Sequence, residues 1–223
     1  MKTRSKVLLL TFCALVLVAA SILGTVAYMT SQKKVTNTFT VGSVSIRLDE
    51  AIVDENGVAA DLTVRTDDTN NTQSYHLIPG QTYTKDPTVT VEANSEQAYV
   101  RMMVTITNYT AVKAAFGNDF LPQNYVDGTW DSTLWVYTVT TEDTQNDTVT
   151  YEFRYFEPVT AGSSDTVLKP LFTQFTLPGT VTGEALANLA NGFAIDVEGH
   201  AIQAATFADA DAAWAAFDAQ VNG

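Results

Sequence analysis

Cysteine is nearly absent from this sequence of 223 residues, and its absence excludes several kinds of chemistry. The single cysteine, Cys13, lies inside an apolar run near the N-terminus. The rest of the chain can therefore form no disulfide, carry no thiol nucleophile and build no cysteine-based zinc site. Its stability must come from an ordinary hydrophobic core. The length allows one sizeable domain or two small ones, and the lack of internal repeats favours one.

Histidine is also scarce, and recognisable enzymatic motifs are missing. His76 and His200 are far apart and lack the paired spacing of a helical zinc site, although two histidines and a carboxylate could still bind zinc. No nucleophile elbow, phosphate-binding loop or dinucleotide fingerprint is present. The acidic clusters at 67–68 and 142–147 lack the spacing of a calcium loop and indicate solvated turns. We therefore expect no catalytic residues, no metal and no cofactor.

Basic residues are few and unevenly placed. The chain has 12 Lys and Arg against 25 Asp and Glu, a net charge of −13. The segment Tyr28–Leu48 contains Lys33, Lys34 and Arg47 and no acid, a net of +3, whereas residues 49–223 have six basic and 25 acidic residues, a net of −19. The acidic body argues against nucleic acid or anionic lipid as a partner. A cationic arm is expected to lie against an acidic body, its own or that of a neighbour.

The sequence has one long hydrophobic run. Basic residues near the start precede Val7–Leu23, which is 17 residues long and uncharged, and small residues follow it. This layout predicts a secretory signal peptide over residues 1–27, cut between Ala27 and Tyr28. The alternative is an uncleaved anchor, because 17 residues is near the lower limit for spanning a bilayer. We expect a secreted protein that contacts the signal peptidase during export and touches the membrane only through this segment before cleavage.

Alternation with a period of two dominates the remaining chain. In Ala98–Asn108, apolar residues at even positions share one face, and Val149–Tyr155 and Leu171–Leu177 also have one-sided apolar sets. Leu134–Val139 is apolar or aromatic on both faces, which predicts a strand covered on both sides. Polar turns separate these runs at intervals of roughly ten residues. The pattern predicts an all-β protein, either a sandwich or a barrel.

Two patches have helical spacing. Residues 182–189 are typical of a short connecting helix, and a second, amphipathic helix is predicted at the C-terminus. Its apolar stripe is expected to pack against the sheets, and its acidic residues are expected to favour solvent. The stripe comprises Phe207, Ala210, Trp214, Phe217 and Val221, and the acidic residues are Asp209, Asp211 and Asp218.

The first strand changes phase at a glycine. Val35, Phe39 and Val41 share one parity, and the apolar residues of 44–48 share the other, with Gly42 between them. A one-residue bulge at Gly42 would bring both sets to the same face. The strand could pair within its own domain or be donated to a neighbouring subunit. Periodicity alone leaves both possibilities open, since each needs the same alternation.

The segment from His76 to Pro87 has the densest local signal. Pro79-Gly80 predicts a turn, and Pro87 is expected at an edge or at the start of a strand. Lys85 and Asp86 could pair with opposite charges on neighbouring strands. A hairpin corner is favoured here over a binding role.

Several stretches together resemble a known group of proteins. They are Gly24–Thr30, Asn37–Gly42, Leu77–Gly80 with Lys85–Pro87, Tyr99–Met102, Ala201–Gln203 and Ala212–Trp214. In order and spacing the chain resembles exported β-sandwich proteins of Gram-positive bacteria that are processed by the signal peptidase SipW. These include TasA-like fibre proteins, camelysin (CalY) and clostridial BsaA-type biofilm matrix proteins, and the matrix proteins look most similar.

The resemblance implies a jelly-roll-like antiparallel β-sandwich with short accessory helices, secreted to the extracellular matrix or cell surface and polymerising with itself. It further implies that the N-terminal strand, within 28–48, is donated to the next subunit, with Val35, Phe39 and Val41 inserting, and that 49–223 forms the sandwich. Camelysin relatives carry a metallopeptidase label, but no metal motif here supports it and we do not expect an enzyme. A secreted metallopeptidase and a monomeric surface-binding module remain the alternatives.

Overall fold

A computed structural model describes Phe12, Leu15 and Val16, residues 43–67 and 71–117, Val126, and residues 129–221. The chain divides into two units, Met1–Val41 and Gly42–Gly223, and all described strands belong to the second. In the described ranges, no helix has both the length and the hydrophobicity that are needed to span a bilayer. Four predictions lie outside the described residues: the signal peptide apart from Phe12, Leu15 and Val16, its cut between Ala27 and Tyr28, the donated residues Val35, Phe39 and Val41, and the bulge at Gly42.

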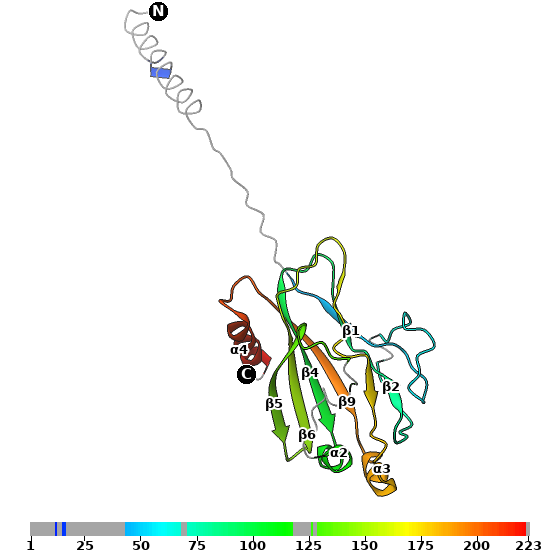
Figure 1. Ribbon diagram of the computed structural model, residues 1–223. Helices are drawn as coiled ribbons and strands as arrows, with labels where there is room; N and C mark the ends of the chain where they lie inside the picture. The colour runs from blue at the N-terminus through cyan, green and yellow to red at the C-terminus, as the bar shows by residue number, and fades with distance from the viewer. Residues whose placement is uncertain are drawn as a thin grey trace, which may run out of the picture. The chain divides into compact units, whose positions relative to one another are not determined.

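The described strands of the second unit pair only antiparallel, in sheets of four, three and two strands (Figure 1). This confirms the predicted all-β class. The four-stranded sheet has the order β5 (Trp135–Asp143), β6 (Thr148–Tyr155), β4 (Ala98–Thr107), β9 (Ile195–Gln203). The three-stranded sheet has the order β1 (Ile46–Asp49), β3 (Thr88–Val91), β7 (Thr166–Val167), and β2 (Thr82–Thr84) pairs with β8 (Gln174–Thr176). The helices of this unit are α2 (Tyr109–Phe116), α3 (Gly183–Leu189) and α4 (Ala210–Val221).

The alternation in β4 explains where the core lies. Its even residues, from Ala98 to Ile106, are all at most 1% exposed, as the sequence predicted. They share the buried side of the sheet with Tyr151 and Phe153 of β6, and Val89 and Val91 of β3 belong to the same core. Successive side chains of a strand point to opposite faces, so burying one parity leaves the other free to contact something else. On this sheet that second face receives α4.

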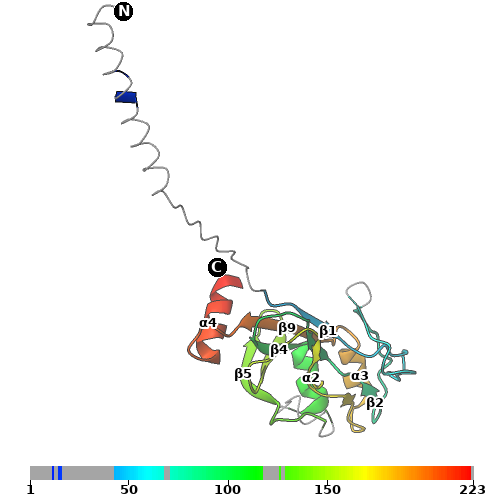
Figure 2. The ribbon, with the colours of Figure 1, turned by 90° about the horizontal axis from the view of Figure 1, so that it is seen from above.

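Helix α4 packs on the outer face of the four-stranded sheet, opposite β1 and β2 (Figure 2). Trp214 is 1% exposed and covers the guanidinium of Arg101, whose carbon lies 4.4 Å from the ring centre. The predicted apolar stripe is correct at Trp214 and wrong at Val221, which is 67% exposed. The side chain of Asp218 is 49% exposed, in line with the expectation that it favours solvent, and its carboxylate also pairs with Arg101.

One further prediction fails at β5. Trp135 is buried, but Val136 and Val139 are 42% and 45% exposed, so this strand is not covered on both sides. The reason is its place in the fold: β5 ends the sheet, beyond the part of the outer face where α4 packs. An apolar run of this length cannot show whether its strand is central or at an edge.

Candidate functional site

The outer edge of β9 lacks a partner strand among the described residues. The N–H of Thr107 donates to the carbonyl of Ala194 at 3.1 Å, and the N–H of Ala204 donates to Gln97 at 2.8 Å. With the continuous register between these points, even-numbered residues of β9 bond to β4. The backbone N–H and C=O groups of the odd residues Ile195, Val197 and Gly199 therefore point away from β4.

The edge of β1 that faces away from β3 is open in the same way over two residues. The N–H of Glu92 donates to the carbonyl of Ser45 at 2.9 Å, and the register then directs the backbone groups of Arg47 and Asp49 toward β3. Those of Ile46 and Leu48 point to the opposite side. The chain covers this edge again only from Glu50, whose carbonyl accepts from the N–H of Thr66 at 2.7 Å.

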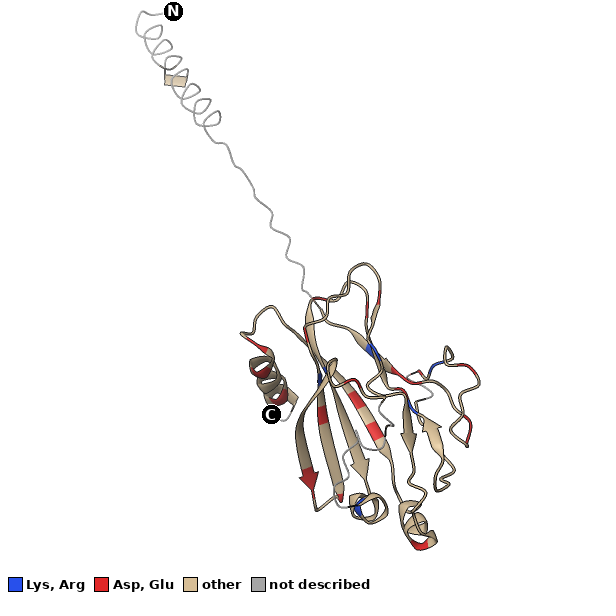
Figure 3. Ribbon diagram, in the orientation of Figure 1, with Lys and Arg blue, Asp and Glu red and all other residues tan. Residues whose placement is uncertain are grey.

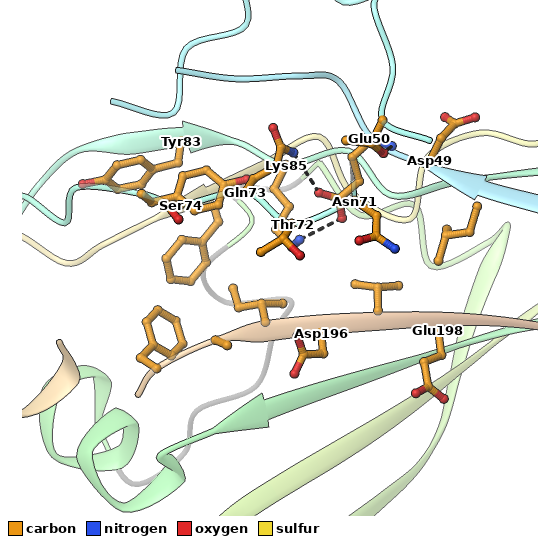
Figure 4. A pocket seen from close by; sticks show the side chains of 18 of the residues that line it. Asp49, Glu50, Asn71, Thr72, Gln73, Ser74, Tyr83, Lys85, Asp196 and Glu198 are labelled. Carbon is orange, nitrogen blue, oxygen red and sulfur yellow. Dashed lines mark hydrogen bonds and ion pairs between the residues drawn. The ribbon is translucent and has the colours of Figure 1, made fainter. Parts of the chain in front are cut away.

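A groove of about 900 Å³ lies between these two edges (Figure 4). On β1 it is lined by Ile46–Asp49, and toward β9 its lining runs from Phe193 to Glu198. It stops before Gly199, where a Cβ atom would lie 3.6 Å from Ile46 Cδ1 and from Leu48 Cβ. These are ordinary contact distances, so β9 lies against β1 at this end, and the groove occupies the rest of the gap between them.

The groove has an apolar side and a polar side. Ile195 and Val197 line it from β9, and Phe175 and Phe193 lie 5.9 Å apart at one end. Asp196 and Glu198 belong to the same strand but point away from the groove, as the alternation requires (Figure 4). Residues Asn71–Tyr75 form a polar wall. A segment entering here would meet apolar side chains and open backbone edges together.

An ion pair lies at the polar side. Lys85 Nζ is 2.8 Å from Glu50 Oε1, and these side chains are 10% and 15% exposed. Nearby, Arg65 pairs with Asp86 and lies 2.7 Å from Asp49. The predicted pairing of Lys85 and Asp86 with opposite charges is therefore confirmed. Because nearly buried charges are costly unless paired, these contacts also fix residues 50–66 against β1 and β3.

The hydroxyl of Tyr75 lies among these charges. Burial raises its pKa well above the usual range, and the nearby carboxylates of Glu50 and Asp86 raise it further. Tyr75 therefore stays a neutral donor at any ordinary pH.

The predicted Pro79-Gly80 turn lies just before the start of β2, and its two residues do not line the groove. The N–H of Gln81 donates to Ile78 at 3.1 Å across it, and Gly80 has a φ of +82°, which a side chain would strain. Pro87 immediately precedes β3, where its missing N–H costs no ladder bond. Of the segment from His76 to Pro87, Leu77, Tyr83 and Lys85 line the groove.

The two histidines have separate surroundings. His76 is an exposed loop residue, whereas His200 lies on the outer face of β9, where its ring stacks on Phe217 at 4.9 Å. Its Nδ1 accepts from Arg101 Nε at 3.2 Å. Burial, together with the positive charge of Arg101, lowers the pKa of His200. In the part of the chain that the structure describes, no three His, Cys, Asp or Glu side chains are grouped to hold a metal ion.

Sequence patterns do not reveal this groove. Its two open edges are formed by backbone groups, and its polar wall, Asn71–Tyr75, is neither helix nor strand. The only signal in that wall is a weak one: Gln73, Tyr75 and Leu77 are half-buried and alternate with exposed residues, as in an extended strand.

Comparisons with protein-family models, with curated proteins and with solved structures found no match to this chain. The relationship to TasA-like and camelysin-like proteins therefore stays a prediction from sequence motifs.

Proposed function

We propose that this protein is a secreted structural subunit of an extracellular matrix fibre, and that residues 28–41 of one copy insert as a strand into the groove of the next. One observation carries the proposal: among the described residues, two strands that each have an edge with open backbone groups line the same cavity. Open edges are normally blunted in proteins, because they pair with other chains. Here both strands line a groove, where pairing can be selective.

The groove offers an added strand both open backbone groups and apolar side chains. The backbone groups of Ile46, Leu48, Ile195 and Val197 would supply main-chain hydrogen bonds, which give affinity in strand addition. The apolar side, with Phe175 and Phe193 at its end, would receive alternate side chains of the guest, which give specificity. Val35, Phe39 and Val41 are the apolar residues of one parity in the proposed guest.

Charge favours the same partner. Arg47 belongs to β1, so the segment before it retains Lys33 and Lys34 and has no acidic residue. Acidic residues greatly outnumber basic ones in the body (Figure 3), and the rim of the groove includes Glu50 and Glu92. Opposite charges speed encounter and suppress wrong partners, and salt screens them. The acidic body would repel other bodies, so the cationic segment is the part best suited to join two copies.

The remaining parts of the proposal rest on sequence. The signal-peptide layout supports secretion, and the motif resemblance supports a jelly-roll topology and a place in the matrix or on the cell surface. The resemblance also supplies the direction of assembly, since the donated segment lies directly after the proposed cut.

Truncation of the N-terminal segment tests the proposal. Chains beginning at Tyr28 and at Gly42 are compared by electron microscopy, and circular dichroism checks that both are folded. We expect filaments from the first and folded monomers from the second. A synthetic peptide of residues 28–41 should bind the shortened chain, whereas a peptide of the same composition with Val35, Phe39 and Val41 shifted to the other parity should not. Filaments from the chain beginning at Gly42 would contradict strand donation.

A further inference from the structure

The polar wall of the groove, residues Asn71–Tyr75, is held in an unusual way. In the described structure, none of its backbone N–H or C=O groups takes part in a hydrogen bond. The next residue, His76, is held through both of its backbone groups. Its N–H donates to the carbonyl of Glu55, and its own carbonyl accepts from the Tyr83 hydroxyl at 3.0 Å. The wall is thus an extended segment that is anchored at His76 and pairs with no strand.

The side chain of Gln73 holds this segment in place. Its carboxamide oxygen accepts from the N–H of Val53 at 2.8 Å, and its Nε2 donates to the carbonyl of Ala51 at 3.1 Å. These two backbone groups belong to one edge, and a neighbouring strand would engage them with its own peptide groups. The carboxamide therefore imitates a backbone partner. Its Nε2 also reaches Glu50 Oε2 at 3.4 Å, which connects the segment to the Lys85 ion pair.

The second contact of the segment is weaker. The hydroxyl of Tyr75 donates to the carbonyl of Thr84 at 3.3 Å, and its ring meets the ring of Tyr83 edge-on at 5.8 Å. Asn71, Thr72 and Ser74 are exposed, and within the described residues their side chains form no hydrogen bond. Releasing Gln73 would therefore free most of the wall, with His76 as the fixed point.

We propose that residues 71–75, which line the groove, form a displaceable strap that Gln73 holds as a latch on the backbone of Ala51 and Val53 beside the groove, and that this strap has to move aside before the entering strand can bind. This inference rests on the proposed function and adds its regulation. An unassembled subunit would keep Ala51 and Val53 satisfied, which protects the edge from pairing with the wrong chain. Opening of the strap would then limit the rate at which subunits join.

The test combines growth rates with a label on the strap. Filament growth is followed by light scattering for the chain beginning at Tyr28 and for its Gln73→Ala and Ser74→Ala variants, with urea unfolding to compare global stability. Gln73→Ala removes the latch, so growth should be faster by about tenfold, since the lost hydrogen bonds hold the closed state. Ser74→Ala, which removes an exposed hydroxyl from the same segment, should leave the rate unchanged. The chain beginning at Tyr28 lacks Cys13 and so has no cysteine, and Thr72→Cys therefore takes a single spin label, which should become more mobile in filaments than in monomers.

The outcomes separate the strap from the fibre. Filaments could form through residues 28–41 while Gln73→Ala grows at the wild-type rate and the label is equally immobile in monomers and filaments. That result would contradict the displaceable strap and leave the proposed fibre function intact. If the chain beginning at Tyr28 forms no filaments, the proposed function and the strap both fall.

Discussion

The four-stranded sheet ends in two very different edges, β5 and β9. Along β5 a register shift between Tyr137 and Val139 interrupts the ladder, and the strand closes with exposed Thr140, Thr141, Glu142 and Asp143. Along β9 the register with β4 is unbroken, and the side chains that line the groove, Ile195 and Val197, are apolar. Bulges and charges are the usual means of blunting an edge.

The contrast shows that one sheet can be closed to pairing at one end and ready for it at the other. The two edges also differ in the ion pairs that hold a helix against the neighbouring strands. On the side of β9, α4 is fastened to β4 through Arg101, which is 3% exposed and contacts Glu152 and Asp218. At β5 the corresponding link is a surface pair, in which Lys113 Nζ lies 3.8 Å from Glu142 Oε2. A strand that receives a guest has to stay in register, and β9 has the firmer backing.

Proline substitutions give the sharpest comparison of the two edges. By the registers of β9 with β4 and of β5 with β6, the N–H of Val197 points away from β4, and the N–H of Thr140 points away from β6. Proline at either position removes an outward N–H and no ladder bond. We expect Val197→Pro to abolish filament growth and Thr140→Pro to preserve it, as measured by electron microscopy and light scattering.

Val197→Ala controls for the side chain lost from the groove and should retain slower growth. Equal growth of the two proline variants would show that β9 is no more a pairing edge than β5.

Removing each ion pair compares the backing of the two edges. Arg101→Ala leaves Glu152, which is 7% exposed, with less compensation, and it strips the cation from beneath Trp214. We expect a loss of about 3 kcal/mol in the free energy of unfolding, as for other broken buried pairs. Lys113→Ala breaks an exposed pair and should cost no more than about 0.5 kcal/mol. Urea unfolding measures both, and similar losses would contradict the difference in support.

Acidification should lower the local stability of β9 and α4 more than that of β5. This is the smallest of the expected effects. The folded protein lowers the pKa of His200 from 6.5 because burial and Arg101 disfavour its charged form. Because the pKa is lower in the folded state, the contribution of neutral His200 to the free energy of unfolding is complete above pH 6.5. It is lost as the pH falls through the pKa of the folded state. Glu198 and Asp218 also face His200 and oppose the shift, so the change should be modest.

The pKa of Asp218 is lowered chiefly by its bond to Arg101, so its contribution disappears only further down, below 3.8. Hydrogen exchange at pH 7.5 and 5.5 should therefore show faster opening of α4 at the lower pH, with β5 unaffected. His200→Gln should remove the difference. If the opening free energy of α4, obtained after correction for the intrinsic pH dependence of exchange, is the same at both pH values, the assignment is contradicted.

The local pattern of residues predicted much of this fold correctly. The one-sided burial of β4, the turn at Pro79-Gly80, the strand start after Pro87 and the C-terminal helix were all predicted from spacing or turn chemistry. Each depends on a few neighbouring residues. The prediction failed at Val139 because exposure there is decided by strands and a helix distant in sequence, which leave β5 at the edge of its sheet.

The groove is also a feature that depends on segments distant in sequence. Sequence indicates that Ile195 and Val197 share a face, but it does not indicate that β9 ends its sheet or that β1 stops opposite it. The latch is hidden for the same reason: nothing near Gln73 in sequence shows that its amide meets the backbone of Ala51 and Val53.

By itself, the sequence determined an antiparallel all-β chain with an acidic body, because alternation and charge are written residue by residue. Only the tertiary structure decided which edges remain open, which carboxylates meet Arg101, and that a side-chain amide stands where a strand would pair. Backbone hydrogen-bonding groups are the same in every residue except proline, so their satisfaction depends on where the chain runs.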